Sequence, residues 1–216
     1  MRSWRIPTAI IVGGIIVAGA IYSMAPPAPR TDPSRVRPVS AADHILGNPS
    51  APVAIVEYAD FACTYCQGFH AILHQIVANE GAMGRVAWVF RHFPLDETTD
   101  SLALAKASEC AADIEGPQTF WSFADALFEK QPVKANDIGS VAASVGITGN
   151  AFATCYSTAS STLDARIATD RQNALDMGAQ GVPFTVILAR GKDPIVLESA
   201  YSYDAVKQLI SQVLSQ

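Results

Sequence analysis

The sequence predicts one main α/β domain that is interrupted by an inserted helical subdomain. A strand–helix–strand pattern opens the folded part, and two strands followed by a helix close it. Between these ends, residues from about 98 to 178 show no convincing strand pattern. With half of its 216 residues hydrophobic, the chain can bury one sizeable core.

The first 24 residues are predicted to be a membrane anchor or a signal peptide. Arg2 and Arg5 precede an uncharged stretch in which Ile6 to Met24 approaches the roughly 20 apolar residues that span a bilayer. Ala18-Gly19-Ala20 matches the small-residue pattern of a cleavage site, so anchor and cleaved signal both stay open, with a buried core helix as a third alternative. An anchor or a signal implies a periplasmic or other extracytoplasmic location, where disulfides persist. An uncleaved segment would hold the protein at the inner membrane.

Residues 25–39 carry five prolines without apolar periodicity, which indicates an extended linker before a domain at 40–216. Of the 15 Lys and Arg residues, five precede Ser40 together with one of the 20 Asp and Glu residues. The domain therefore has 10 basic and 19 acidic residues, a net charge of −9 with His neutral. This charge argues against nucleic acid as a partner.

The domain is expected to begin with two strands and a helix between them. "VAIVEYA", residues 53–59, is rich in β-branched residues and predicts a strand. After Cys66, apolar residues recur at helical spacing and predict one buried helix face: Phe69, Ile72, Leu73, Ile76 and Val77. "RVAWVFRHF", residues 85–93, predicts a second strand, and a unit of this kind favours a parallel pair.

Four helices are expected in the inserted subdomain, at about residues 98–178. They are predicted over 101–112, 118–130, 136–145 and 150–176. Asn136 is a plausible N-cap of the third of these helices, and Gly146 is expected to end it.

Two strands and a helix are predicted to close the domain. "FTVIL", residues 184–188, predicts a strand whose partner is "IVLES", residues 195–199, across the turn "RGKDP". The final helix has an apolar face: Val206, Leu209, Ile210, Val213 and Leu214.

The sequence Cys63-Thr64-Tyr65-Cys66 lies where the first strand gives way to the first helix. A cysteine at a helix N-terminus faces unpaired amide groups and the positive end of the helix dipole, which stabilise a thiolate. A stabilised thiolate is a good leaving group, so a disulfide that contains it tends to oxidise its partner. The pattern therefore favours redox chemistry.

Glu57 lies six residues before Cys63, inside the apolar strand. At a two-residue period it shares a face with Val53 and Ile55. A carboxylic acid among buried neighbours has a raised pKa and could exchange a proton with a buried thiol. A glutamate that faces water on an edge strand is the alternative.

Two other interpretations of the cysteine pair stay open. Zinc sites use the same Cys-x-x-Cys spacing, and His70 lies one helical turn after Cys66, with His74 one turn further. The chain lacks the second cysteine pair and the longer Cys-to-His spacing of ordinary zinc modules, so both histidines are expected to flank the apolar helix face, half exposed. No metal is predicted. A purely structural disulfide is the other alternative.

Taken together, these motifs resemble the DsbA-type thiol:disulfide oxidoreductases, which have a thioredoxin-like fold interrupted by an inserted helical subdomain. The resemblance covers about residues 42–214. It rests on "EYADFACTYC" at 57–66, "FRHFPL" at 90–95 and "GVPFTVIL" at 181–188.

The resemblance implies a role for each matched residue. Cys63 corresponds to the exposed nucleophilic cysteine and Cys66 to the buried resolving cysteine. Glu57 corresponds to the buried acid beneath the pair, and Pro183 to a cis-proline that packs beside the disulfide. Val182 corresponds to the residue whose backbone pairs with an extended substrate segment.

Thr64, Tyr65 and Val182 are the predicted substrate-binding residues. In the family, valine before the cis-proline is usual in oxidases, whereas isomerases more often carry threonine. The dipeptide between the cysteines departs from the family pattern, because oxidases often have histidine where this chain has Tyr65. The oxidising strength of the pair therefore stays open.

The predicted function is dithiol oxidation that introduces disulfides into exported proteins. The family implies no cofactor, a monomer, reduced exported proteins as substrates, and reoxidation by a quinone-linked membrane enzyme of DsbB or VKOR type. A disulfide isomerase or reductase of the same fold is the first alternative, although the usual isomerase has a separate dimerisation domain. A metal-binding module built from Cys63, Cys66 and His70 is the second.

Cys110 and Cys155 both lie in the predicted helical subdomain. With Cys63 and Cys66 paired with each other, one pairing remains for these two cysteines, and some members of the family carry such a second bridge. We expect a structural disulfide between them. Two buried free thiols and a regulatory redox pair are the alternatives.

Overall fold

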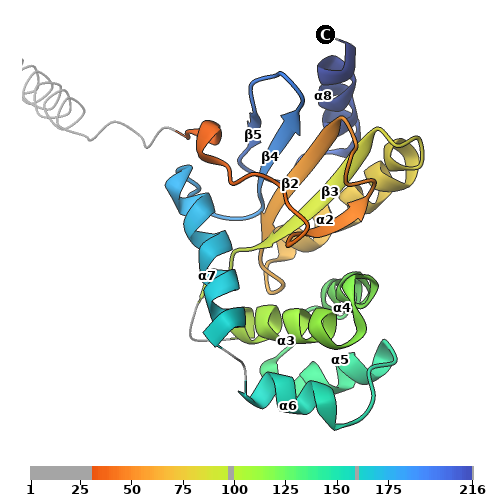
Figure 1. Ribbon diagram of the computed structural model, residues 1–216, viewed down its shortest axis with the longest axis vertical. Coiled ribbons are helices and arrows are strands. Elements are labelled where there is room, and N and C mark those ends of the chain that lie inside the picture. The colour runs from red at the N-terminus through yellow and green to blue at the C-terminus, as the bar shows by residue number, and fades with distance from the viewer. Residues whose placement is uncertain (1–30, 97–99, 159–160, 216) are drawn as a thin grey trace, which may run out of the picture. The chain divides into compact units, whose positions relative to one another are not determined.

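A five-stranded sheet forms the centre of the protein (Figure 1). The computed structural model describes residues 31–96, 100–158 and 161–215. The strands, in the order in which they lie in the sheet, are β1 (His44–Gly47), β3 (Val86–His92), β2 (Val53–Ala59), β4 (Phe184–Ala189) and β5 (Ile195–Leu197). β2 and β3 are parallel, and every other neighbouring pair is antiparallel. The predicted α/β fold class is confirmed.

The helices begin and end within a few residues of the predicted ones, and one predicted helix is divided into two. They are α2 (Thr64–Ile76), α3 (Asp100–Glu115), α4 (Pro117–Glu129), α5 (Ile138–Ser144), α6 (Asn150–Thr158), α7 (Ser161–Asp176) and α8 (Tyr203–Ser215). The single helix predicted over 150–176 is wrong, because the structure has two separate helices there: α6 contacts α3, and α7 contacts β3 as well as α3. Asn136 does not cap α5, since it lies inside a short 3-10 turn, η3 (Ala135–Asp137).

Helices cover both faces of the sheet, which explains why β3 is buried throughout and β2 is buried at every residue except the partly buried Ala54. On one face, Val53, Ile55 and Trp88 pack with apolar residues of α2 and α8. On the other face, Val56 and Val89 pack with the C-terminal part of α7 and the residues that follow it. Alternate residues of one strand thus serve two cores, as the two-residue period of a strand requires.

The helices α3 to α6 form a block whose core continues the first of these two cores. α3 contacts α4, α5 and α6. The apolar side chains at their contacts are Leu104, Phe120, Phe123, Leu127 and Phe152. Within the described residues from 100 to 176 there is no strand, as predicted for the insertion.

α2 ends in a wider, π-helical turn, η2 (Val77–Gly81). A Cβ atom on Gly81 would lie 3.0 Å from Val77 Cγ1 and 3.2 Å from the carbonyl oxygen of Val86. The close approach of the turn to β3 therefore favours glycine at this position.

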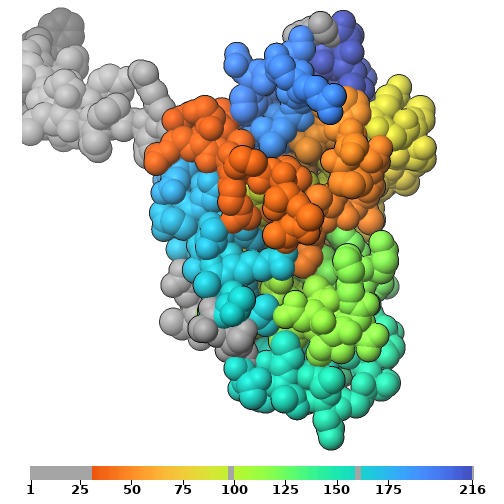
Figure 2. All heavy atoms as spheres, in the orientation of Figure 1, coloured from red at the N-terminus to blue at the C-terminus, as the bar shows by residue number. Residues whose placement is uncertain are grey.

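Residues 31–39 of the predicted linker lie against α7 (Figure 2, orange against light blue). The amide of Asp32 donates to the carbonyl of Met177, and the amide of Arg37 donates to Oδ1 of Asn173. The predicted anchor or signal at residues 1–24, and residues 25–30 of the linker, lie outside the described residues. Among the described helices, none has the length and apolar character needed to cross a membrane.

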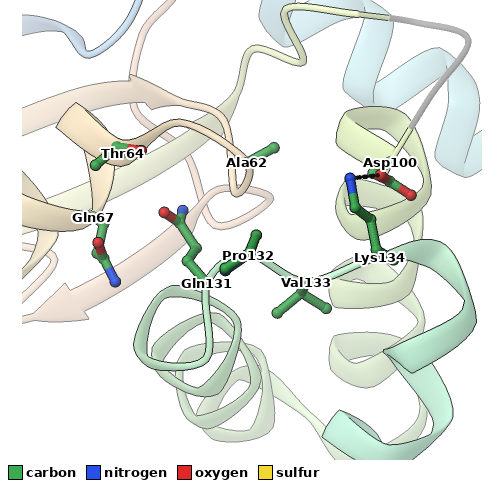
Figure 3. Close-up of a pocket in the computed structure, with 8 residues that line it drawn as sticks. All are labelled: Ala62, Thr64, Gln67, Asp100, Gln131, Pro132, Val133 and Lys134. Atoms are coloured by element: carbon green, nitrogen blue, oxygen red, sulfur yellow. Dashed lines mark ion pairs between the residues drawn. The ribbon is translucent and has the colours of Figure 1, made fainter.

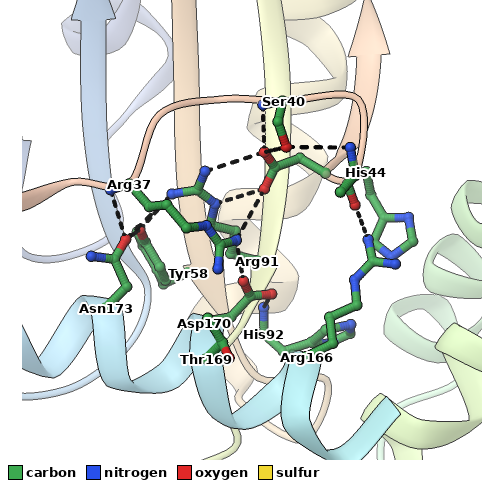
Figure 4. A network of polar contacts seen from close by, with 12 residues as sticks. Arg37, Ser40, His44, Tyr58, Arg91, His92, Arg166, Thr169, Asp170 and Asn173 are labelled. Atoms are coloured by element: carbon green, nitrogen blue, oxygen red, sulfur yellow. Dashed lines mark hydrogen bonds and ion pairs between the residues drawn. The ribbon is translucent and has the colours of Figure 1, made fainter. Parts of the chain in front are cut away.

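A buried polar network joins this N-terminal segment to the sheet and to α7 (Figure 4). Arg91 is completely buried on β3, and its guanidinium donates to both carboxylate oxygens of Asp43 and to the Tyr58 hydroxyl. Arg37 makes an ion pair of 2.6 Å with Asp170 of α7. A buried charge is tolerated only when it is paired, and here the pairing fastens residues before β1 to the domain.

Candidate active site

Cys63 occupies the N-cap position of α2, at the point where β2 has ended and the chain turns into the helix. Its Sγ atom accepts a hydrogen bond of 3.3 Å from the amide of Cys66, one of the amides that a helix N-terminus leaves without a partner. Asp60 shapes the preceding loop, because its carboxylate accepts hydrogen bonds from the amides of Ala62 and Leu95. The loop thus presents one sulfur atom to the positive end of a helix.

The pKa of Cys63 is lowered to about 7. The largest cause is a hydrogen bond from the thiol of Cys66, followed among the lowering effects by hydrogen bonds from the amides of Cys66 and Tyr65. Partial burial and the charge of Asp60 act in the opposite direction. Cys63 is therefore substantially ionised at neutral pH, as a nucleophilic or leaving sulfur must be.

Cys66 has the opposite character. It is completely buried in the first turn of α2, and burial raises the pKa of its thiol far above the usual value. The negative charges of Cys63 and Glu57 raise that pKa further. Both cysteines are free thiols in this structure, so it represents the reduced form, with the charge placed on Cys63.

Glu57 is completely buried on the central strand β2, so the alternative of a solvent-exposed glutamate on an edge strand is wrong. Its Oε2 atom accepts a hydrogen bond of 3.1 Å from the indole of Trp88, whereas Oε1 has no hydrogen-bond partner within the described part of the chain. Burial raises the pKa of Glu57 to about 8, and the negative charge of Cys63 adds to the effect. The acid is mostly protonated at neutral pH and can give its proton away.

Val182 and Pro183 face the cysteine pair from the loop before β4. The peptide bond between them is cis. The Cys63 thiol donates a hydrogen bond of 3.7 Å to the carbonyl oxygen of Val182. The structure therefore brings Glu57, Cys63, Cys66, Val182 and Pro183 into one site, although these residues come from three separate segments.

Thr64 and Tyr65 lie on the outer surface of the first turn of α2. The Tyr65 side chain is 75 % exposed, an unusual placement for a large aromatic residue. Thr64 borders a cavity of about 370 Å³ between this turn and the helical block (Figure 3). The cavity is lined by Ala62, Thr64, Gln67, Asp100, Gln131, Pro132, Val133 and Lys134.

Gln131, Asp60 and Trp88 contribute to the site but were not among the predicted site residues. Gln131 follows α4, and its side-chain amide donates to the carbonyl oxygens of Phe61 and Cys63, so it ties the cysteine loop to the helical block. No local pattern marks Gln131, because its partners lie about 70 positions earlier in the chain. Asp60 could have been noticed, because an aspartate just before a loop often accepts a hydrogen bond from the backbone amide two residues later, as it does here from Ala62.

Cys110 and Cys155 are joined by a disulfide that links α3 to α6. The bridge lies within the helical block. Its position is that of a structural crosslink between two helices.

His70 is buried, contrary to the half-exposed placement expected from the sequence, and His74 is partly exposed. Both rings point to Asp125 of α4 rather than to the cysteines. Hydrogen bonds from the two histidines hold the pKa of Asp125 at about 2, although burial acts in the opposite direction. Within the described residues, no cluster of three ligand side chains includes Cys63 or Cys66, so the predicted alternative of a Cys/His metal module finds no support.

The chain matches the family model described as Thioredoxin over residues 40–212, and it belongs to the thioredoxin family. The structure is similar to that of alpha-DsbA1 from Wolbachia pipientis, with a TM-score of 0.71 and 23 % identity over 85 % of this chain and 96 % of that chain. It is also similar to oxidised BdbD from Bacillus subtilis, with a TM-score of 0.69 and 25 % identity over 84 % and 97 % of the two chains. The sequence-based recognition of a DsbA-type protein is confirmed.

Curated relatives match parts of the chain. The Na(+)/H(+) antiporter NhaA 1 of Mycolicibacterium gilvum (strain PYR-GCK) is 31 % identical over 143 residues, which cover 65 % of this chain and 22 % of the antiporter. Disulfide bond formation protein D of Bacillus subtilis (strain 168) is 34 % identical over 89 residues, which cover 41 % and 39 % of the two proteins. The chain thus spans about a quarter or less of the length of the antiporters that it matches.

Proposed function

We propose that this chain is a thiol:disulfide oxidoreductase that acts outside the cytoplasm as a dithiol oxidase and introduces disulfides into exported proteins. The observation that carries the proposal is the asymmetry of the cysteine pair. Cys63 is accessible and has a pKa of about 7, whereas Cys66 is buried with a strongly raised pKa. An attacking thiolate can reach only the first sulfur, and the second is the one that leaves.

The reaction begins with the oxidised pair. A client thiolate attacks Sγ of Cys63, the Cys63–Cys66 bond breaks, and Cys66 leaves with the electron pair while a mixed disulfide forms. A second client thiolate then attacks the client sulfur of the mixed disulfide and expels Cys63 as a thiolate. Two electrons have moved from the client dithiol to the pair, and the client has gained one disulfide.

Glu57 supplies the proton that the first step needs. The departing sulfur of Cys66 is in apolar surroundings, where a thiolate is strongly disfavoured. Glu57 interacts electrostatically with Cys66 and is protonated at neutral pH, so it acts as a general acid toward the leaving thiolate. When the pair is reoxidised, the resulting carboxylate takes the proton back.

Client segments are proposed to lie along Val182, with contacts to Thr64 and Tyr65. The carbonyl oxygen of Val182 is already within hydrogen-bond distance of Cys63, so a backbone amide of an extended client can use it while the client sulfur approaches Cys63. The exposed Tyr65 ring and the cavity beside Thr64 offer apolar and polar surface to the adjoining client residues.

The proposed partners follow from the chemistry and from the N-terminal segment. Reduced exported proteins are the substrates, and each turnover leaves a dithiol that must be reoxidised. A quinone-linked membrane enzyme of DsbB or VKOR type is the proposed oxidant. An anchor or signal at residues 1–24 would direct the domain at 40–216 to the periplasm or another extracytoplasmic location. The two arginines and the uncharged apolar stretch that follows them support this proposal. The chain is proposed to act as a monomer without a cofactor.

One observation favours a second candidate, a disulfide reductase or isomerase. A pKa of about 7 at Cys63 is close to that of the thioredoxin cysteine, whereas the nucleophilic cysteine of the strongly oxidising DsbA has a pKa of about 3.5. A less stabilised thiolate makes a weaker oxidant. The reduction potential of the pair therefore separates the two candidates.

The test is equilibration of the Cys63/Cys66 pair against glutathione, together with oxidation of a reduced test protein. A potential well above about −270 mV, the thioredoxin value, supports the oxidase, and a value near or below it supports the reductase. Cys63→Ala and Cys66→Ala are each expected to abolish oxidation of the test protein, because neither variant can form the Cys63–Cys66 disulfide, and Cys66→Ala is expected to keep a mixed disulfide between Cys63 and glutathione when oxidised glutathione is supplied. Full activity of the Cys63→Ala variant would exclude both candidates.

A further inference from the structure

Two histidines and one aspartate converge on the flank of α2 that faces the helical block. The Nε2 atoms of His70 and His74 each lie 2.7 Å from the same atom, Oδ1 of Asp125 on α4. The histidines are four residues apart, so they lie on one face of α2, and their rings meet edge to face with centroids 4.7 Å apart. The three potential ligand atoms lie within 4.8 Å of one another.

We propose that His70, His74 and Asp125 form a zinc site with one open coordination position. Two imidazole nitrogens and one carboxylate oxygen are a ligand set that zinc accepts, and three protein ligands leave the fourth position for water or an added ligand. Histidines at i and i+4 on one helix are the spacing with which a helix chelates zinc. Asp125 completes the set from a second helix.

The Asp125 carboxylate must move to admit the ion, because its Oδ1 atom lies closer to both Nε2 atoms than two zinc ligands do. Ligand atoms about 2.1 Å from a tetrahedral zinc lie roughly 3.4 Å apart, so the carboxylate must move outward by about 0.7 Å. Asp125 can do so, because its side chain is 46 % exposed. The exposed fraction of the His74 side chain is 35 %, so solvent reaches the site from the same side.

The surrounding aromatic residues fix the two imidazole rings. The Trp88 ring lies 4.8 Å from the ring of His70 and 5.1 Å from that of His74, and the Phe128 ring lies 4.4 Å from His70. Ligands held in place by packing lose little conformational freedom when an ion binds. Two indole rings, those of Trp88 and Trp121, contact the histidines and can report an ion spectroscopically.

A second cluster in the domain is less suited to bind zinc. His44, His92 and Glu109 also converge, but Nη1 of Arg166 lies 3.1 Å from Oε2 of Glu109. A guanidinium next to the carboxylate repels a cation and already neutralises the charge that would attract one. Asp125 has no such arginine or lysine among its ion pairs in the described residues.

One feature limits the affinity of the proposed site. Binding of zinc to Nε2 moves the ring proton of each histidine to Nδ1, and Nδ1 of His70 is buried with no hydrogen-bond acceptor in the described structure. Histidine ligands usually donate this proton to an acceptor, and loss of such a contact weakens binding about 10–100-fold. We therefore expect zinc to bind about 10–100-fold more weakly here than at a site where both histidines donate their Nδ1 proton to an acceptor.

The test uses the full chain with Cys63→Ser and Cys66→Ser, because thiolates also bind zinc and the remaining cysteines form a disulfide. Calorimetric titration with Zn²⁺ is expected to give one ion per chain. Co²⁺ is expected to give the visible absorption of a four-coordinate site and to quench tryptophan fluorescence, since Trp88 contacts both histidine rings.

Substitutions in the same background identify the ligands. His74→Gln and Asp125→Asn are each expected to weaken Zn²⁺ binding at least about tenfold and to abolish the Co²⁺ absorption, and both positions are exposed enough to be replaced without disturbing the core. Asp204→Asn, an exposed acid on α8, is the matched control and should bind as the parent does. Absence of stoichiometric Zn²⁺ binding, or unchanged binding in both ligand variants with native circular dichroism, would overturn the proposal. The three residues would then act only as a hydrogen-bonded contact between α2 and α4.

Discussion

Glu57 shows how one buried residue can serve the chemistry while it lowers the stability of the fold. Its pKa of about 8 means that folding must protonate it at neutral pH, whereas an exposed glutamate ionises near 4.5. Below pH 4.5 there is no such penalty. The penalty grows as pH rises from there to about 8, and at pH 7 it amounts to about 3 kcal/mol.

Glu57→Gln is therefore expected to stabilise the reduced protein at pH 7 by up to about 3 kcal/mol and to have little effect near pH 4. Glutamine keeps an oxygen for the Trp88 indole, and Oγ1 of Thr185 on the adjacent strand, which has no hydrogen-bond partner among the described residues, is available to its amide group. Urea unfolding of both proteins at the two pH values measures the difference. An equal gain at both values would contradict the assigned pKa.

The same substitution should slow client oxidation, because glutamine cannot protonate the leaving Cys66. The expected loss is about a hundredfold, the low end of the contribution of a positioned proton donor. The advantage of the wild type over the variant should fall as pH rises through about 8, where Glu57 ionises. Comparing the two proteins at each pH removes the ionisation of the client thiols from the ratio.

At the scale of single elements, the disulfide between α3 and α6 constrains the helical block. The bridge joins residues 45 positions apart. In the chain-entropy model a loop of this length stabilises the folded state by about 4 kcal/mol. The double variant Cys110→Ala/Cys155→Ala is expected to lose about that amount.

Urea unfolding under non-reducing conditions measures the effect, with the wild type as reference. Glutathione equilibration of the double variant is the control, since Cys63 and Cys66 lie outside the bridged block and their potential should not change. A loss below about 1 kcal/mol would show that the helices are held by packing alone, and a shifted potential would show that the bridge acts on the redox pair.

The elements with long periodic patterns could be predicted from the sequence, and those fixed by distant contacts could not. α2, β2, β3 and α8 follow from apolar spacing within each segment. β1 was not predicted, because four residues at a sheet edge give too short a pattern and depend on pairing with β3. The division of the predicted helix 150–176 depends on partners far along the chain, which are α3 for α6 and both β3 and α3 for α7.

The site residues fall into the same two groups: some stand in short sequence motifs, and others are placed by contacts between distant segments. Cys63, Cys66 and Pro183 stand in short motifs that resemble a known family, so they could be named from the sequence. Gln131 could not, because only the folded chain brings it to the carbonyl of Cys63. The partnership of the two α2 histidines with Asp125 is likewise a product of helix packing.

At the scale of the whole molecule, Arg91 joins three parts of the domain. It contacts Asp43 before β1, the carbonyl of Pro38, and Tyr58 on β2. These contacts hold the pKa of Asp43 below its usual value, although burial alone would raise it. Removing the guanidinium leaves a buried carboxylate with a single, longer ion pair to Arg37.

Arg91→Met is expected to destabilise the protein by about 3–5 kcal/mol, the usual effect of breaking a buried ion pair. Hydrogen exchange should increase at residues 32–43, because their docking on α7 and β3 depends on the network. The control is Arg190→Met, an exposed arginine just after β4, which should change stability by less than about 0.5 kcal/mol. Unchanged exchange in the Arg91 variant would show that the segment docks independently of the network.

The π-helical turn at the end of α2 also determines where the chain tolerates changes in length. A π turn holds one residue more than an α turn, so a deletion between Val77 and Gly81 can convert it to ordinary helix while the preceding part of α2 keeps its orientation. A deletion between Cys66 and His70 cannot be absorbed in this way, because that part of α2 is ordinary α-helix. It would rotate one part of the helix by about 100° against the other and separate the orientation of the redox pair from that of the buried helix face. Insertions and deletions during evolution of this segment are therefore expected to collect after Ile76.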